Sequence, residues 1–360
     1  MLLSMDADRA LVAEKDAEIL ALEAQILALR AAKELAQSRL DSYTYPVLTM
    51  PPEIVSEVFL HFLPPYPDPP SFTGLHSPIC LTHICTQWRI IALSTPRLWR
   101  AIGLGDRNWP EEGGTALAEL WLERSGDLPL SIRVTDYEND YSNGLPFTIF
   151  APLLPHRDRW ERLILTICEP TNMLAIDGPM PLLHTLHIVL GEQGLSNPLS
   201  IHDVPCLRTL VLDDFGTPSV NLPWSQLTSL ALQSIDVDEC ISILQQIPNL
   251  VDCRLRIWVE GMIQGPYPDI PLFCLEALVI EKNSDSDLHF FHSLVTPALR
   301  HLEFWEAFSR TVNSECIESL KAFISKSGCT LDELRVTGAQ IPYHFYRSAF
   351  PQIPSIVLEE

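Results

Sequence analysis

Three stretches of the sequence share one pattern: MPLLHTLHIVL (180–190), VPCLRTLVLDD (204–214) and TPALRHLEFWE (296–306). Each contains a proline, a leucine two residues later, and apolar residues at the third and fifth positions after that leucine. The last two apolar positions alternate as they would on one face of a strand. The proline restricts the backbone at the entry to that strand. The pattern therefore predicts a short strand with one buried face.

The apolar spacing recurs about every 24 residues, which is within the period of leucine-rich repeats. Matches begin at Trp160, Leu183, Leu207, Leu227, Leu250, Leu275, Leu299, Leu331 and Ile353. The preceding proline accompanies five of them, as Pro181, Pro205, Pro248, Pro297 and Pro351. Between the matches, residues 238–247, 286–295 and 315–328 have helical spacing. Residues 156–360 are therefore expected to form an irregular α/β solenoid, a horseshoe of stacked parallel strands.

The concave strand face of such a solenoid is the expected recognition surface. The candidate substrate-binding residues on it are Arg208, Thr209, Asp252, Arg254, Arg300, Glu303 and Arg335. This mixed polar face is suited to a protein segment rather than a phosphate polymer, and its acids favour a basic partner. An ordinary solvated face is the alternative interpretation.

Residues 1–45 contain the second repeating pattern. Residues 7–40 lack proline and glycine and are rich in Ala, Leu, Glu and Lys. A heptad is interrupted by Lys15 and Lys33, and its apolar positions are Val12, Ile19, Leu22, Ile26, Leu29, Ala36 and Leu40. A coiled-coil helix that could form a homodimer is predicted. The alternative is an amphipathic helix packed on its own protein; a membrane-surface helix is disfavoured because its polar face is not rich in cations.

Residues 46–104 read as a small helical module with a proline-rich insertion. The segment PPEIVSEVFLHFL (51–63) has one wide apolar stripe, and its prolines suit a first helical turn. A second helix is predicted to begin at Ser77-Pro78 and to end at Ser94-Thr95-Pro96. A short strand should follow at LWRAIGL (98–104). In the connector, 105–155, DLPLSIRV (127–134) is a candidate extra strand.

This module resembles an F-box in the form common in fungal proteins. The resemblance rests on the Pro-Glu-Ile helix start at 52–54, on C-x-x-W-R at 85–89 and on T-P-x-L-W at 95–99. Met50 departs from the usual leucine, and the proline-rich loop lengthens the module. The repeats resemble the irregular leucine-rich-repeat region that often follows an F-box. The resemblance implies an α+β multidomain chain whose F-box docks on the Skp-type adaptor and cullin of an SCF ubiquitin ligase, while the repeats bind an unknown target protein.

About 50 helical residues cannot bury every large apolar side chain of the module, so part of this surface is expected to contact a partner. About half of the apolar positions should instead form the module's own core. The candidate docking residues are Pro51, Pro52, Ile54, Val58, Phe59, Leu63, Leu81 and Trp99.

Composition excludes several classes of function. The chain has 24 basic and 46 acidic residues and a net charge of −22, which disfavours nucleic acids and anionic membranes as partners. Nine cysteines without a C-x-x-C pair are typical of a reducing compartment, the cytosol or nucleus. No apolar run has the length of a membrane span.

Catalytic motifs are not evident. The sequence has no nucleophile elbow or phosphate-binding loop. The His184/His187 pair falls in a predicted strand, where the two rings point to opposite faces, and the His289/His292 pair lacks a third ligand. No catalytic, cofactor-binding or metal-ligating residue is assigned, and a non-enzymatic adaptor is expected. A scaffold that uses the same modules without ubiquitination is the main alternative, and a hydrolase with a cryptic site is a third.

Overall fold

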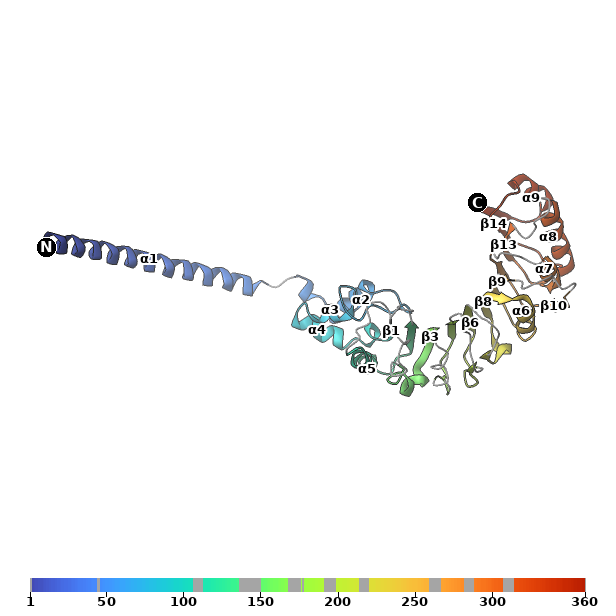
Figure 1. Cartoon of the computed structure of the whole chain (residues 1–360), viewed down its shortest axis with the longest axis horizontal. Helices are drawn as coiled ribbons and strands as arrows, with labels where there is room; N and C mark the ends of the chain where they lie inside the picture. The colour runs from blue at the N-terminus through green and yellow to red at the C-terminus, as the bar shows by residue number, and fades with distance from the viewer. Residues whose placement is uncertain are drawn as a thin grey trace. The chain divides into compact units, whose positions relative to one another are not determined.

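The computed structural model describes residues 2–43, 46–105, 113–135, 150–167, 176, 178–190, 199–213, 220–258, 267–281, 288–306 and 314–359. The chain is α+β, with a long N-terminal helix and a large parallel sheet (Figure 1). It divides into two compact units, Met1–Val55 and Ser56–Glu360. The connector therefore falls inside the second unit, and parts of it, 106–112 and 136–149, lie outside the described residues.

The first unit is dominated by α1 (Leu2–Ser42), a helix of 41 residues that is about 62 Å long. The predicted helix is confirmed. Its sequence has no proline or glycine to interrupt the backbone hydrogen bonds, and alanine and leucine favour the helical state. Every α1 side chain that the structure describes is exposed. A short 3₁₀ turn, Pro46–Thr49, follows.

The helical module contains α2 (Pro52–Phe62), α3 (Pro78–Thr82) and α4 (Thr86–Leu93). Ser77 caps α3 as predicted, because its hydroxyl oxygen accepts a hydrogen bond from the amide of Ile79 at 3.2 Å. The prediction of one continuous second helix is wrong, because α3 and α4 are separate helices. Cys85 is extended, and its sulfur accepts a hydrogen bond from the amide of Trp88, which makes this cysteine the cap of a separate helix.

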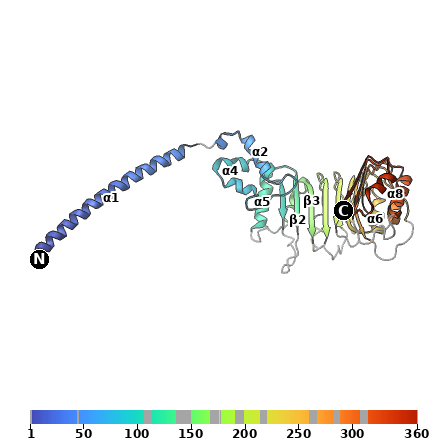
Figure 2. The same ribbon diagram turned by 90° about the horizontal axis from the view of Figure 1, so that it is seen from above.

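Among the described residues, eleven parallel strands form one sheet, and each strand pairs with the next strand of this sheet along the chain (Figures 1 and 2). The strands are β1 (Ala101–Leu104), β2 (Leu130–Thr135), β3 (Trp160–Ile167), β4 (Thr185–Leu190), β6 (Thr209–Asp213), β8 (Ser229–Asp236), β9 (Asp252–Trp258), β11 (Ala277–Ile280), β13 (His301–Trp305), β14 (Glu333–Thr337) and β15 (Ser355–Glu359). The strands expected at 98–104 and 127–134 are β1 and β2. Two small sheets pair β5 (Leu199–Ser200) with β7 (Val220–Asn221), and β10 (Ile270–Pro271) with β12 (Leu294–Val295).

The repeat pattern predicted these strands correctly. Apart from Trp160, which begins β3, each match starts two residues before a strand. A hydrogen-bonded turn precedes the strand; in one example the Leu207 amide donates to the Val204 carbonyl at 3.1 Å. Pro205 occupies the second position of this turn, where its fixed φ is favourable. The first apolar residue is buried at all nine positions: Trp160, Leu183, Leu207, Leu227, Leu250, Leu275, Leu299, Leu331 and Ile353.

Helices lie on one side of the later strands (Figure 1). The three predicted helices correspond to α6 (Val237–Leu244), α7 (Leu288–Ser293) and α8 (Ser314–Ser327). Gly328 ends α8 with φ of +65°, a conformation that glycine adopts without steric cost. The sequence did not predict α5 (Gly114–Arg124) and α9 (Tyr343–Ala349). No helix in the described part of the chain is both long enough and apolar enough to span a membrane.

Candidate protein-binding surfaces

Helix α2 has two apolar faces with opposite environments. Every fourth residue on one face is buried, with 1 to 9% of its surface exposed: Val55, Phe59 and Leu63. The neighbouring face has the same spacing but is 41 to 52% exposed: Ile54, Val58 and Phe62. The wide stripe in the sequence therefore consists of a core face and an exposed face. We call the second set the α2 exposed line.

Aromatic contacts fix the core face. The rings of Phe59 and Trp88 meet edge to face, with centroids 4.9 Å apart. Trp99 is fully buried, its indole nitrogen donates to the Ala92 carbonyl at 2.9 Å, and its ring meets that of Trp121 at 5.4 Å. Helix α5 supplies Trp121, so the connector contributes to the core of the helical module.

The structure divides the eight predicted docking residues into two groups. Phe59, Leu63, Leu81 and Trp99 are buried, so they support the module from inside and present no surface to a partner. These four residues therefore belong to the core of the module and not to an exposed docking surface, contrary to the prediction. The exposed group is Pro51, Pro52, Ile54 and Val58.

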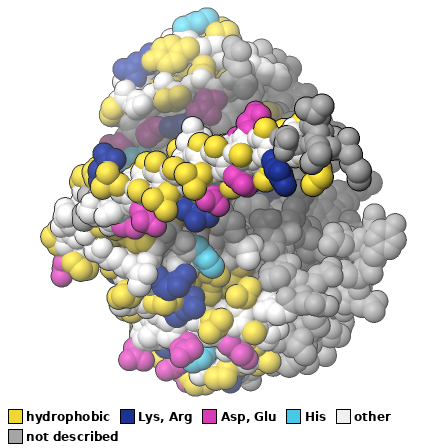
Figure 3. Space-filling model, turned by 90° about the vertical axis from the view of Figure 1, so that its left-hand side faces the viewer, with side chains coloured by type: hydrophobic (Ala, Val, Ile, Leu, Met, Phe, Trp, Pro, Cys, Tyr) yellow, Lys and Arg dark blue, Asp and Glu magenta, His cyan; other side chains and the backbone are white. Residues whose placement is uncertain are grey.

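The predicted docking set omits several exposed apolar residues of the module. Phe62 completes the α2 exposed line, and Ile90 and Leu93 are exposed on α4. The signal for the last two was present, since they are one helical turn apart and flank the buried Ile91. In the described part of the face drawn in Figure 3, hydrophobic side chains are interspersed with acidic and basic groups.

The proline-rich insertion packs on the first strands of the sheet. The Ser131 hydroxyl donates to the Pro67 carbonyl at 2.7 Å, and Asp68 pairs with Arg133 at 2.7 Å. The Pro69 ring lies so close to Gly103 that an added Cβ would be 3.1 Å from it. Since Gly103 pairs with Arg133 in the sheet register, these contacts lie on one face of β1 and β2.

Tyr66 adds a charged contact to the same loop. Its hydroxyl donates to the carboxylate of Glu161, and the guanidinium of Arg100 lies 3.6 Å from the centre of its ring. Burial and the Glu161 hydrogen bond raise the pKa of Tyr66, which keeps the phenol protonated. The proline-rich insertion therefore connects the helical module to the sheet, a role that the sequence did not indicate.

The sheet face opposite the buried leucines presents two regular rows of side chains. The register places the first row on Thr185, Thr209, Ser229, Asp252, Ala277, His301 and Glu333. The second row contains His187, Val211, Ala231, Arg254, Val279, Glu303 and Arg335. We call these residues the sheet-face rows.

Five of the seven predicted substrate-binding residues belong to the sheet-face rows: Thr209, Asp252, Arg254, Glu303 and Arg335. The other two lie just before β6 and β13, at the strand entries. There Arg208 donates to the carbonyl of Leu207 at 2.8 Å, and Arg300 pairs with Asp332 at 3.2 Å. The structure thus brings most of the predicted set to one face and places two arginines at its border.

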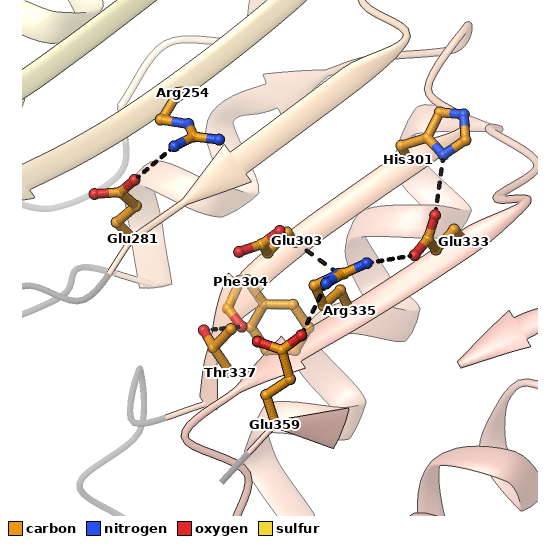
Figure 4. Close-up of polar contacts among 9 residues, drawn as sticks. All are labelled: Arg254, Glu281, His301, Glu303, Phe304, Glu333, Arg335, Thr337 and Glu359. Carbon is orange, nitrogen blue, oxygen red and sulfur yellow. Dashed lines mark hydrogen bonds and ion pairs between the residues drawn. The ribbon is translucent and has the colours of Figure 1, made fainter. Parts of the chain in front are cut away.

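Ion pairs between neighbouring strands dominate the C-terminal part of this face (Figure 4). Arg335 contacts three carboxylates, those of Glu359 at 2.8 Å, Glu333 at 3.1 Å and Glu303 at 3.8 Å. The hydrogen bond that Arg335 donates to Glu333, together with the charge of Glu359, raises the pKa of Arg335. This surface therefore presents paired charges of both signs, because each cation already has an acidic neighbour.

A similar cluster of ion pairs lies on β9 and at the end of β11. Arg254 and Arg256 both contact the carboxylate of Glu281, at 3.3 and 2.9 Å. All three side chains project from β9 and the end of β11 on the open face.

The described histidines do not form a metal site. His184 lies at a strand entry with Nδ1 2.6 Å from the Leu182 carbonyl, whereas His187 lies in a sheet-face row. Burial lowers the pKa of His187, and Asp213 opposes that effect, so the ring is neutral at neutral pH. Among the described residues no group of three metal-ligating side chains occurs. The His289 side chain lies outside them.

No known protein-family model matches the chain, and no curated protein matches it.

Proposed function

We propose that the chain is a substrate-recognition adaptor of an SCF-type cullin-RING ubiquitin ligase. In this proposal α2 to α4 form an F-box that docks on a Skp-type adaptor, and the strands form a leucine-rich-repeat-like horseshoe. The sheet-face rows bind the target protein. The chain contributes proximity rather than bond-making chemistry, because it holds a target lysine close to the ubiquitin-charged enzyme.

The observation that carries this proposal is the α2 exposed line. Ile54, Val58 and Phe62 expose about half of their surface on one helix face, although the adjacent face is fully buried. A line of aliphatic and aromatic residues at this spacing is the pattern by which a helix docks into a partner's hydrophobic groove. Burying the remaining half of Val58 alone would contribute about 1 kcal/mol to binding.

The contacts between the proline-rich insertion and the sheet support the same function. Proximity accelerates a reaction only when the two bound partners are held in a defined geometry. Contacts of Pro67, Asp68 and Pro69 with β1 and β2 join the helical module to the sheet within the second unit. In the proposal, these contacts help to keep the helical module and the sheet together while both partners are bound.

The proposal is tested by co-expressing the full chain with a fungal Skp-type adaptor and measuring complex formation by size-exclusion chromatography and calorimetry. The test variant is Ile54→Asp/Val58→Asp, which places unpaired charges in the α2 exposed line without touching the core. The matched control is Phe273→Asp, since Phe273 is 64% exposed outside the helical module. We expect a complex with one adaptor per chain for wild type and control, and at least a tenfold weaker complex for the test variant. Failure of folded wild type to bind would refute the adaptor role.

A non-ligase scaffold would keep the same docking helix, so adaptor binding alone does not separate the two functions. Adding the cullin and RING subunits to the purified complex does. Assembly of all four proteins, with ubiquitin transfer to the chain itself or to a bound target, supports the ligase function. A stable adaptor complex that excludes the cullin supports the scaffold.

A further inference from the structure

Helix α1 carries an apolar seam in a complete heptad frame. The frame extends the heptad toward the N-terminus: the a positions are Met5, Val12, Ile19, Ile26, Lys33 and Leu40, and the d positions are Asp8, Lys15, Leu22, Leu29 and Ala36. All these side chains are exposed along an uninterrupted helix. A helix of this length with four consecutive aliphatic seam positions, from Ile19 to Leu29, has the surface that a two-stranded coiled coil requires.

The charges of the seam favour a second copy of α1 as its coiled-coil partner. Three seam positions are ionised, namely Asp8, Lys15 and Lys33. Asp8 lies near the start of α1, and Lys33 lies near its end. A partner that presents the opposite order of charges at matching distances is the same helix in the reverse direction.

The two possible directions differ sharply in these charged positions. In a parallel pair each seam residue faces its own copy, so the aspartates at position 8 and the lysines at positions 15 and 33 all face like charges. Like charges that lose water at an interface core are unfavourable. The alternation of isoleucine at a and leucine at d favours parallel pairing, but it acts on only four central layers.

An antiparallel pair centred between residues 20 and 21 removes every one of these repulsions. Asp8 then faces Lys33 of the partner copy at both ends of the pair, and Ile19 faces Leu22 of the partner copy at the centre. Lys15 faces Ile26, where a lysine can extend its ammonium group to solvent. Outside the seam either direction leaves some like charges opposite each other, where exposure to water makes their cost small.

We infer that α1 forms an antiparallel two-stranded coiled coil with a second copy of this chain, held in register by two Asp8–Lys33 pairs. The dimer places the C-terminal ends of the two α1 helices at opposite ends of the coiled coil. This inference does not depend on the adaptor function, and none of its tests involves α2.

The first test measures the oligomeric state of the full chain by light scattering over a range of concentrations. Ile19→Glu/Ile26→Glu places charges in the seam and should convert the dimer to a monomer. The matched control is Leu20→Glu/Leu27→Glu, because these two leucines are 72 and 73% exposed and lie outside the seam. The control should remain dimeric. A monomeric wild type, or equal loss in both variants, would overturn the inference.

The second test determines direction. Val12→Cys and Leu29→Cys variants are prepared separately, mixed, oxidised and digested, and the linked peptides are identified by mass spectrometry. Residues 1–45 contain no native cysteine, so every link in this region is introduced. The antiparallel pair predicts a link between position 12 of one copy and position 29 of the other. Links of position 12 only to position 12, and 29 only to 29, would show a parallel pair and refute the inference.

A charge exchange gives an independent readout. Lys33→Asp should weaken the dimer about tenfold, because it opposes two carboxylates at each end. The double variant Asp8→Lys/Lys33→Asp should restore the wild-type affinity. In a parallel pair the double variant would bring no recovery.

Discussion

Two adjacent residues of α2, Val58 and Phe59, should respond in opposite ways to substitution. Val58 is 50% exposed, whereas Phe59 is 1% exposed and contacts the ring of Trp88. Removing a buried phenylalanine side chain costs about 3 to 5 kcal/mol, which includes the cavity that remains and the lost aromatic contact. Substitution of a half-exposed surface residue away from such contacts changes stability by about 0.5 kcal/mol or less.

The expected results are therefore specific for each position. Phe59→Ala should lose about a fifth or more of the folding free energy of a typical domain, which is roughly 5 to 15 kcal/mol. Val58→Asp should unfold at the wild-type temperature and still bind the Skp-type adaptor at least tenfold more weakly. Thermal unfolding followed by circular dichroism gives the stabilities, and calorimetry of the folded variants gives the affinities.

The opposite pattern would refute the reasoning. If Val58→Asp destabilised the protein as strongly as Phe59→Ala, the α2 exposed line would belong to the core. If Val58→Asp were stable and bound the adaptor with unchanged affinity, that line would not be the docking surface.

Three further predictions concern stability. Burial, assisted by the charge of Asp236, raises the pKa of Glu239 from 4.5 to about 7. The free energy of unfolding should therefore fall as the pH rises through this interval. Glu239→Gln should melt at the wild-type temperature at pH 4, and at a higher temperature than wild type at pH 8. The buried Glu306 carboxylate accepts two backbone amides at 2.7 and 2.8 Å, and Glu306→Ala should lower the free energy of unfolding by roughly 2 to 5 kcal/mol in urea titrations, whereas an unchanged midpoint would contradict this role. Gly103→Val should displace Pro69 and increase proteolysis of the proline-rich insertion, with no change in α1 helicity.

The order and period of the strands could be read from the sequence because each repeat carries its own local signals. A turn with proline at its second position, followed by alternating apolar residues, specifies where a strand begins and which face is buried. The same is true of α1, whose length and exposed seam follow from the absence of helix breakers and from the heptad. The helix near 314–327 was also predictable, because its spacing and terminal glycine are local features.

Tertiary packing decided what local patterns leave open. The apolar stripe of α2 is continuous in the sequence, yet Phe59 is buried against Trp88 while Val58 is exposed. The contacts of the proline-rich insertion join residues that are about 65 positions apart in the sequence, such as Asp68 and Arg133. No local sequence pattern encodes a contact over that separation. Local hydrogen bonding and side-chain alternation act over a few residues and are therefore written in the sequence. The division of an apolar surface between core and partner depends on which distant side chains cover it, so the folded chain alone determines it.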